Sequence, residues 1–168
     1  MTNVLYEVTY RLDRGMLIPF IVAAGFLFFF VREIKAIRCE KTAKGHRVNL
    51  CIFFIGLALG FVVCVIEIVS QIDMYQNIVA AYHNGQYATV EGYVEDFVPM
   101  PAEGHAHETF QINGVAFDYS DNTALQGYNK PKVHGGVISG DGQHLKIRYI
   151  YYAHWDCNVI VYIEELSP

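Results

Sequence analysis

Charge is scarce in this sequence, and that scarcity excludes several classes of protein. Asp, Glu, Lys and Arg make up 17% of the 168 residues, whereas about a quarter is usual for a soluble globular domain. The formal net charge of −5 excludes a basic nucleic-acid binder, so we expect no nucleic-acid polymer as a partner. With 53% hydrophobic residues, the chain is not a disordered protein either.

Cysteine is also sparse, and its positions exclude a disulfide scaffold. The four cysteines are scattered, at Cys39, Cys51, Cys64 and Cys157. Cys157 is the one cysteine that follows residue 72, so no intramolecular disulfide can staple the second part of the chain. Its stability must come from a packed core.

What the sequence does have is two long apolar runs near its start. Residues 16–31 and 50–66 carry no charge. Each run is just long enough for a bilayer core of about 30 Å, and flanking Arg14 and Arg32 can lengthen the first span by snorkelling. The remaining chain is too small to bury two apolar helices. We therefore predict a multi-pass protein of the bacterial inner membrane, in which residues 1–72 form a transmembrane hairpin with spans at about 16–32 and 50–70.

The connection between the spans, residues 32–48, predicts the direction of the hairpin. It holds six basic residues, at positions 32, 35, 38, 41, 44 and 47. The positive-inside rule makes this loop cytoplasmic and places the N-terminus and everything after about residue 72 on the other side. From residue 71 onwards, the sequence has four basic and twelve acidic residues.

Gly56 and Gly60 form a small-xxx-small pair in the second span. This spacing lets two helix backbones approach closely in lipid. The partner is either the first span or a second copy of the chain, in which case the spans make a homo-oligomer.

The residues after the hairpin predict a small β-rich domain. Residues 73–85 have helical spacing and form a connecting helix. Residues 86–168 then alternate, with strands expected at 87–98, 110–119, 144–152 and 158–164, and Asn113-Gly114 marks a type I′ hairpin. The fold class is thus α+β, with an antiparallel β-barrel of OB type as the first choice and a two-layer β-sandwich as the alternative.

Two polar loops hold the candidate site residues. In residues 99–108, His105 and His107 are weak candidates for a metal site. Such a site needs two further His, for which His134 and His144 are possible; solvated imidazoles are the simpler interpretation, so we predict no metal and no cofactor. Residues 120–142 combine cations, amides, aromatic rings and glycines, which suits a small anionic ligand with a ring to stack; a solvated loop tip is the alternative. The predicted ligand-binding residues are Tyr119, Asp121, Tyr128, Asn129, Lys130, Lys132 and His134.

Ser120, Asp121 and His134 are also the residue types of a hydrolase triad. The chain lacks the G-x-S-x-G elbow and any second signature of an oxyanion hole. We therefore predict a non-enzymatic protein.

An ordered string of short motifs runs from about residue 85 to residue 165. The motifs are Val90-Glu-Gly92, Pro99-Met-Pro101, Glu103-Gly-His105, Glu108-x-Phe110, Asn113-Gly-Val-x-Phe117, Tyr119-Ser-Asp121, Gly127-Tyr-Asn129, His134-Gly-Gly136 and Asn158-x-Ile160. This string resembles a β-domain found in small bacterial membrane proteins. Together with the two spans, it is similar to the two-transmembrane β-domain effectors of bacterial cyclic-nucleotide anti-phage systems. The resemblance implies a barrel that binds a cyclic dinucleotide and a hairpin that damages the membrane.

The resemblance and the charge pattern disagree about sidedness. A cyclic dinucleotide made in the cytoplasm requires a cytoplasmic β-domain, whereas the basic loop predicts a β-domain outside the cytoplasm. Two functions therefore stay open: a ligand-sensing β-domain on a membrane hairpin, or an envelope-facing structural or protein-interaction module.

Overall fold

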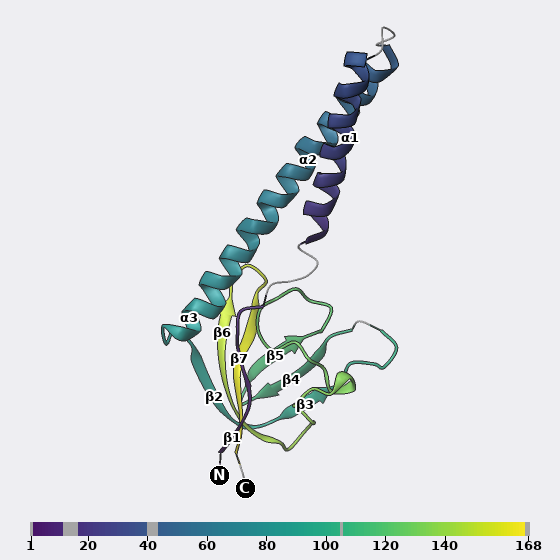
Figure 1. The fold of residues 1–168 in the computed structure, drawn as a ribbon. Coiled ribbons are helices and arrows are strands. Elements are labelled where there is room, and N and C mark those ends of the chain that lie inside the picture. Colours follow the sequence, from purple (N-terminus) through teal and green to yellow (C-terminus); the bar gives the residue numbers. More distant parts are fainter. Residues whose placement is uncertain (1, 12–16, 40–43, 105, 167–168) are drawn as a thin grey trace. The chain divides into compact units, whose positions relative to one another are not determined.

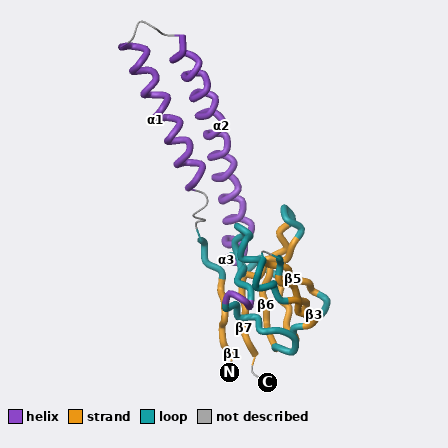
Figure 2. Tube along the Cα trace, turned by 90° about the vertical axis from the view of Figure 1, so that its right-hand side faces the viewer, coloured by secondary structure: helices purple, strands orange, loops and turns teal. Residues whose placement is uncertain are grey.

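The computed structural model describes residues 2–11, 17–39, 44–104 and 106–166. The chain divides into two compact units: Met1–Arg11 with Asp73–Pro168, here called the β unit, and Leu12–Ile72, here called the helical unit. Figures 1 and 2 show the elements of each unit along the chain.

The helical unit consists of α1 (Leu17–Cys39) and α2 (Lys44–Met74). Both are long and apolar enough to cross a membrane, and only 6% of the most apolar window of each is buried. Large apolar side chains such as Phe28 and Phe61 are about two-thirds exposed (65% and 67%). The basic loop expected at 32–48 is mostly helical instead, because α1 extends to Cys39 and α2 begins at Lys44.

The two glycines of the second span lie against α1. Gly60 is next to Ala23, where an added Cβ would come 3.3 Å from the Ala23 Cβ, and a Cβ on Gly56 would come 2.4 Å from the ring of Phe26. Phe29 stacks on Phe53 with ring centroids 5.6 Å apart. Of the two partners considered for this glycine pair, the structure places the first span there.

The β unit contains two antiparallel sheets. The larger has the order β1 (Thr2–Glu7), β7 (Cys157–Leu166), β6 (His144–Tyr152), β2 (Ala88–Tyr93), and the smaller has the order β3 (Glu95–Val98), β4 (Glu108–Ile112), β5 (Val115–Tyr119). The sheets do not close into a barrel, so the OB-like prediction is wrong while the α+β class is confirmed. The reason lies at Val94, which interrupts the expected strand 87–98. Its N–H donates to Gln143 O and its carbonyl accepts from Gly142 N–H, both at 2.9 Å.

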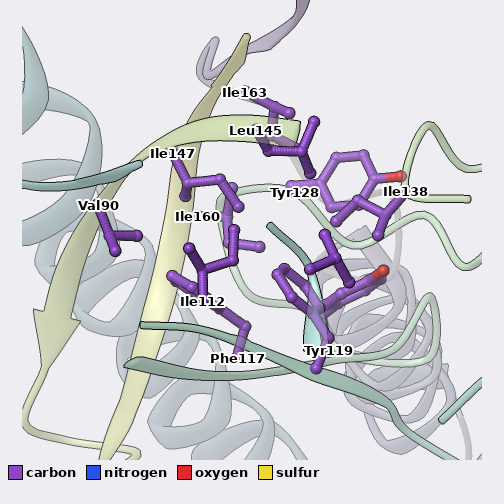
Figure 3. Close-up of a cluster of buried hydrophobic side chains, with 12 residues drawn as sticks. Val90, Ile112, Phe117, Tyr119, Tyr128, Ile138, Leu145, Ile147, Ile160 and Ile163 are labelled. Atoms are coloured by element: carbon purple, nitrogen blue, oxygen red, sulfur yellow. The ribbon is translucent and has the colours of Figure 1, made fainter. Parts of the chain in front are cut away.

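The buried faces of the two sheets meet in one apolar cluster, shown in Figure 3. Its members come from β2, β4, β5, β6 and β7, and along β4, β5 and β6 they alternate as the strand period requires. Ile112, Phe117, Leu145, Ile147 and Ile163 are at most 1% exposed. At about 25 cal/mol per Å² of buried apolar surface, such a cluster is the main stabilising contribution to the unit.

The connecting helix predicted at 73–85 exists, but as a continuation of α2. A π-helical segment, Tyr75–Ala80, follows α2 directly and leads into α3 (Ala81–His83). Ile78, Val79 and Tyr82 pack on the other face of the larger sheet, against Val159 and Val161. β7 is therefore buried on both faces.

The Asn113-Gly114 hairpin is confirmed. Ile112 pairs with Val115, and Asn113 and Gly114 have φ values of 49° and 79°. Positive φ at both central residues is what a type I′ turn needs.

Strand β1 was not predicted, because residues 2–7 were assigned to the transmembrane hairpin as its flank. The strand pairs with β7, with Thr2 opposite Leu166 and Glu7 opposite Tyr162. Val8, just after β1, is 1% exposed and belongs to the same cluster as Ile78. The first residues of the chain thus complete the β unit.

Candidate functional site

A cavity of about 350 Å³ opens in the β unit. It is enclosed by four stretches that are distant in sequence: His107, residues 116–119 of β5, residues 123–129, and residues 151–160 at the turn between β6 and β7. Its volume falls in the range of small-molecule sites, about 300 to 1,000 Å³.

Aromatic rings form much of the wall. Tyr151 and Trp155, at the β6–β7 turn, are 59% and 47% exposed, whereas Phe117, Tyr119 and Tyr128 are buried. The Tyr151 hydroxyl donates to Asp156 Oδ1 at 2.6 Å. Asp156 has φ 50°, so the turn holds this carboxylate in a backbone conformation that few residues adopt.

The charged groups of the wall are acidic. Asp118 and Asp156 line the cavity, and none of the described lining residues is Lys or Arg. Asp118 Oδ1 pairs with His107 Nδ1. Burial, with both carboxylates nearby, raises the pKa of the Cys157 thiol. The site therefore has a negative electrostatic environment and no activated thiolate.

Two side chains of the β unit hydrogen-bond the residues at which this unit ends along the chain, Arg11 and Asp73. Gln126 brackets the backbone of Arg11: its Oε1 accepts from Arg11 N–H at 3.1 Å, and its Nε2 donates to Arg11 O at 2.5 Å. Arg11 is the last residue of the β unit before α1.

Asp73 is held by Tyr152, which belongs to the second apolar cluster and does not line the cavity. The Tyr152 hydroxyl, between the lining residues Tyr151 and Cys157, donates to Asp73 Oδ2 at 2.5 Å, and Asp73 is the first residue of the β unit after α2. Tyr10 and Tyr75, close to Arg11 and Asp73 in the sequence, make an edge-to-face contact at 5.4 Å.

The structure separates the seven predicted ligand-binding residues into two groups. Tyr119, Tyr128 and Asn129 line the cavity, whereas Asp121, Lys130, Lys132 and His134 do not. Asp121 Oδ2 lies 2.6 Å from His134 Nδ1, and Lys132 Nζ donates to Ser139 O at 2.5 Å. The seven predicted residues therefore do not all line this cavity.

The loop 120–142 is not a solvated tip either, because it packs into the core. Ile138 is fully buried, the Tyr128 hydroxyl accepts from Val137 N–H at 2.7 Å, and Gly127 adopts φ 127° against Val159 and Ile160. Burial raises the pKa of Tyr128 to about 12. The loop therefore shapes the cavity as a fixed wall.

Glu108 is the buried centre that anchors both polar loops. It is 0% exposed. Its carboxyl accepts from Lys132 N–H at 3.0 Å, from Met100 N–H at 3.4 Å and from the Tyr119 hydroxyl. Burial and Glu108 raise the pKa of Tyr119 far above its usual value. Glu108 is a structural anchor that sequence reasoning missed.

The other candidate chemistries gain little from the geometry. In the described part of the chain, no three His, Cys, Asp or Glu side chains lie close enough to hold a metal ion; His105 is outside the described residues. Ser120 is fully buried, and its Oγ accepts from Asn122 N–H at 3.3 Å. The Nδ1 atom of His134 pairs with Asp121.

Sequence reasoning missed the cavity because its wall comes from separate segments that no local spacing connects. One signal was present. Trp155 is the single tryptophan of the chain, and it stands in a connection between two strands rather than in a core position.

Comparison with known proteins gives no family for this chain: no family model, no curated protein and no solved structure matches it.

Proposed function

We propose that this protein is a non-enzymatic, membrane-anchored ligand sensor, in which the cavity of the β unit binds a small molecule and its occupancy is passed to the membrane helices. The observation that carries the proposal is the position of Gln126. This cavity residue hydrogen-bonds the Arg11 backbone on both sides, so a ligand that moves residues 123–129 also moves the start of the segment leading to α1.

The membrane anchoring is supported by exposure and by strand pairing. Apolar helices that nothing in the described chain covers need lipid or another chain around them. β1 pairs with β7, so residues 2–7 and 157–166 must be on one side of a membrane. An even number of crossings between them meets that condition, and the two helices supply it.

The test uses the buried thiol of Cys64, which is 7% exposed in the helical unit, as a reporter. Cys39, Cys51 and Cys157 are replaced by Ser, and the rate of maleimide labelling of Cys64 is measured in dodecyl maltoside. Ala116→Phe fills the cavity from its wall, and Gln126→Ala removes the link to Arg11. We expect each to change the labelling rate by about fivefold, the lower range of allosteric coupling.

The control for this assay is Glu95→Gln, a change at an exposed carboxylate of β3 outside the cavity. It should leave the rate unchanged. Identical rates in the parent protein, Ala116→Phe and Gln126→Ala would contradict the proposed coupling between cavity and helices.

A second candidate is the cyclic-nucleotide effector that the motif string suggests. The amides of Asn129 and Asn158 in the cavity wall favour it, because such groups can hydrogen-bond base edges. It predicts that expression of the full chain depolarises the membrane and that Ala116→Phe alters the effect. A membrane-potential dye measures the depolarisation. An unchanged potential on expression of the parent chain and of Ala116→Phe would contradict this candidate. Residues 73–168 alone are not a valid control, because they lack β1.

Sidedness separates the sensor from the envelope-facing interaction module, which stays a proposal of its own. The basic residues around the connection between the helices favour a β unit outside the cytoplasm. Reporter fusions before Met1 and after Pro168 should agree with each other. If a reporter that is active only in the cytoplasm gives a signal at both ends, the β unit is not outside the cytoplasm. If the two ends give different results, the two helices do not form a hairpin.

A further inference from the structure

We infer that the cavity of the β unit binds an organic cation, an ammonium group carried on a small apolar or aromatic frame, held between Asp118, Asp156 and the rings of Tyr151 and Trp155. This inference rests on the proposed function, since it names the ligand class of the same cavity. It differs from the anionic ligand that the lysine-bearing loop predicted.

The first argument is charge. The described wall has two carboxylates and neither Lys nor Arg. Lys132, which belongs to the predicted cationic cluster, does not line the cavity. Its ammonium group donates to Ser139 O and lies 5.6 Å from the Phe97 ring centroid. The one basic side chain of the described wall, His107, is already paired with Asp118. An anion in the cavity would therefore face two carboxylates, whereas an ammonium group would be attracted by both.

The second argument is the hydrogen bonding of the two carboxylates. Asp118 Oδ1 pairs with His107 Nδ1, and Asp156 Oδ1 accepts from the Tyr151 hydroxyl. Among the described residues, Oδ2 of each carboxylate has no hydrogen-bond partner and can accept from a ligand. Because the partners fix the orientation of both side chains, little side-chain entropy is lost when a cation binds.

The third argument is the aromatic wall. Rings attract a cation over their faces, most strongly for Trp, and the combination of rings with carboxylates is the usual chemistry of ammonium recognition. Tyr151 and Trp155 are large, half-exposed rings in a short turn. Exposed aromatic side chains at a cavity mouth cost hydrophobic free energy unless something covers them. An alkylammonium ligand would cover them with its methyl or methylene groups.

The experiment uses Trp155 itself. As the only tryptophan, it makes the intrinsic fluorescence of the full chain a report on this cavity. The intact protein in dodecyl maltoside, which has no ammonium group, is titrated with choline and with its uncharged isostere 3,3-dimethyl-1-butanol. We expect a saturable change with choline and at least about tenfold weaker binding of the isostere, since only the cation gains the electrostatic attraction.

Matched variants locate the effect. Asp118→Asn and Asp156→Asn should each weaken choline binding about tenfold, and both should leave binding of the isostere unchanged. Glu95→Gln removes the same charge from an exposed position on β3 and should have no effect. Far-ultraviolet circular dichroism checks that each variant is folded.

The outcomes separate this inference from the function on which it rests. Equal binding of choline and the isostere, tighter binding of a cyclic dinucleotide, or no saturable change with choline would overturn the cation, even where Ala116→Phe still alters Cys64 labelling. If Cys64 labelling is also insensitive, the sensor itself fails. Where choline binds, added phosphatidylcholine decides its source: competition identifies a lipid headgroup, and lack of competition identifies a soluble ammonium compound.

Discussion

Replacing Glu108 by alanine should be among the most damaging single substitutions in the β unit. The carboxyl group is fully buried and accepts from Lys132 N–H, Met100 N–H and the Tyr119 hydroxyl. Glu108→Ala leaves these donors without a partner, and each unsatisfied buried donor costs about 1 to 3 kcal/mol. The Met100 contact, at 3.4 Å, is weak. Counting the other two, we expect a loss of about 2 to 6 kcal/mol.

Tyr119→Phe separates the anchor from its surroundings. This change removes one donor and leaves the carboxyl group with its two N–H partners, so it should cost about 1 to 2 kcal/mol. In the Glu108→Ala background the same change removes an unpaired hydroxyl and should cost less. The double-mutant cycle should therefore give a coupling of at least about 1 kcal/mol.

Guanidinium unfolding of the full chain in detergent, followed by Trp155 fluorescence, measures these free energies. Since the only tryptophan belongs to the β unit, the signal is specific to that unit. Glu95→Gln, at an exposed position, should change the free energy of unfolding by less than about 0.5 kcal/mol. A loss below about 1 kcal/mol for Glu108→Ala would refute the assignment of Glu108 as the anchor of both loops.

Three further predictions follow from the packing. Gly56→Leu should destabilise the pair α1–α2 by about 1 to 3 kcal/mol because its Cβ would meet the Phe26 ring at 2.4 Å; helical melting by circular dichroism measures this, and Gly25→Ala, which meets nothing within 4 Å, is the control. Burial raises the pKa of Tyr6 and Tyr128 to about 12 from 10.0, so the folded state keeps protons that the unfolded chain loses, and stability should be constant below about pH 10 and fall towards about pH 12. Denaturant midpoints measured across this pH range test the prediction. If stability falls as steeply with pH in Tyr128→Phe as in the parent protein, the raised pKa of Tyr128 does not contribute to the decline. Gly127→Ala should cost more than Gly85→Ala, because both have positive φ but only Gly127 would bring a Cβ within 2.5 Å of Val159; equal unfolding midpoints would show that the contact is not tight.

The elements that the sequence predicted well are those whose signals are local. The Asn113-Gly114 turn needs only two residues with positive φ between alternating runs, and β6 follows from the alternation of residues 144–152. The two apolar helices follow from run length alone. In each case the physical cause operates within a dozen residues.

The elements that it missed depend on contacts between distant segments. β1 is a six-residue segment that precedes an apolar helix in the sequence. It forms a strand because β7, about 155 residues later, offers an edge with which it pairs. The barrel failed because Val94 bonds to a loop nearly 50 residues away. Glu108 has an ordinary position in a loop-to-strand sequence, and its burial follows from donors that come from two other segments.

The candidate site shows the same division. Tyr119, Tyr128 and Asn129 were found because the loop after β5 is rich in functional residue types, and they do line the cavity. Asp118, Asp156 and Trp155 were not predicted. Asp118 lies in β5, the other two lie in the turn between β6 and β7, and only the packing of the sheets brings these segments together. Composition pointed to the loop after β5, which lines part of the cavity, but it could not indicate that the carboxylates of the wall come from other segments.

The pairing of β1 with β7 has a consequence for how the protein is made. The first strand leaves the ribosome well before its neighbour, and sheet formation at this edge must wait for the last residues of the chain. During that interval β1 has no partner strand, and an unpaired strand is exposed to aggregation or to a chaperone. Synthesis that stalls before residue 157 therefore leaves β1 without its only partner strand among the described residues.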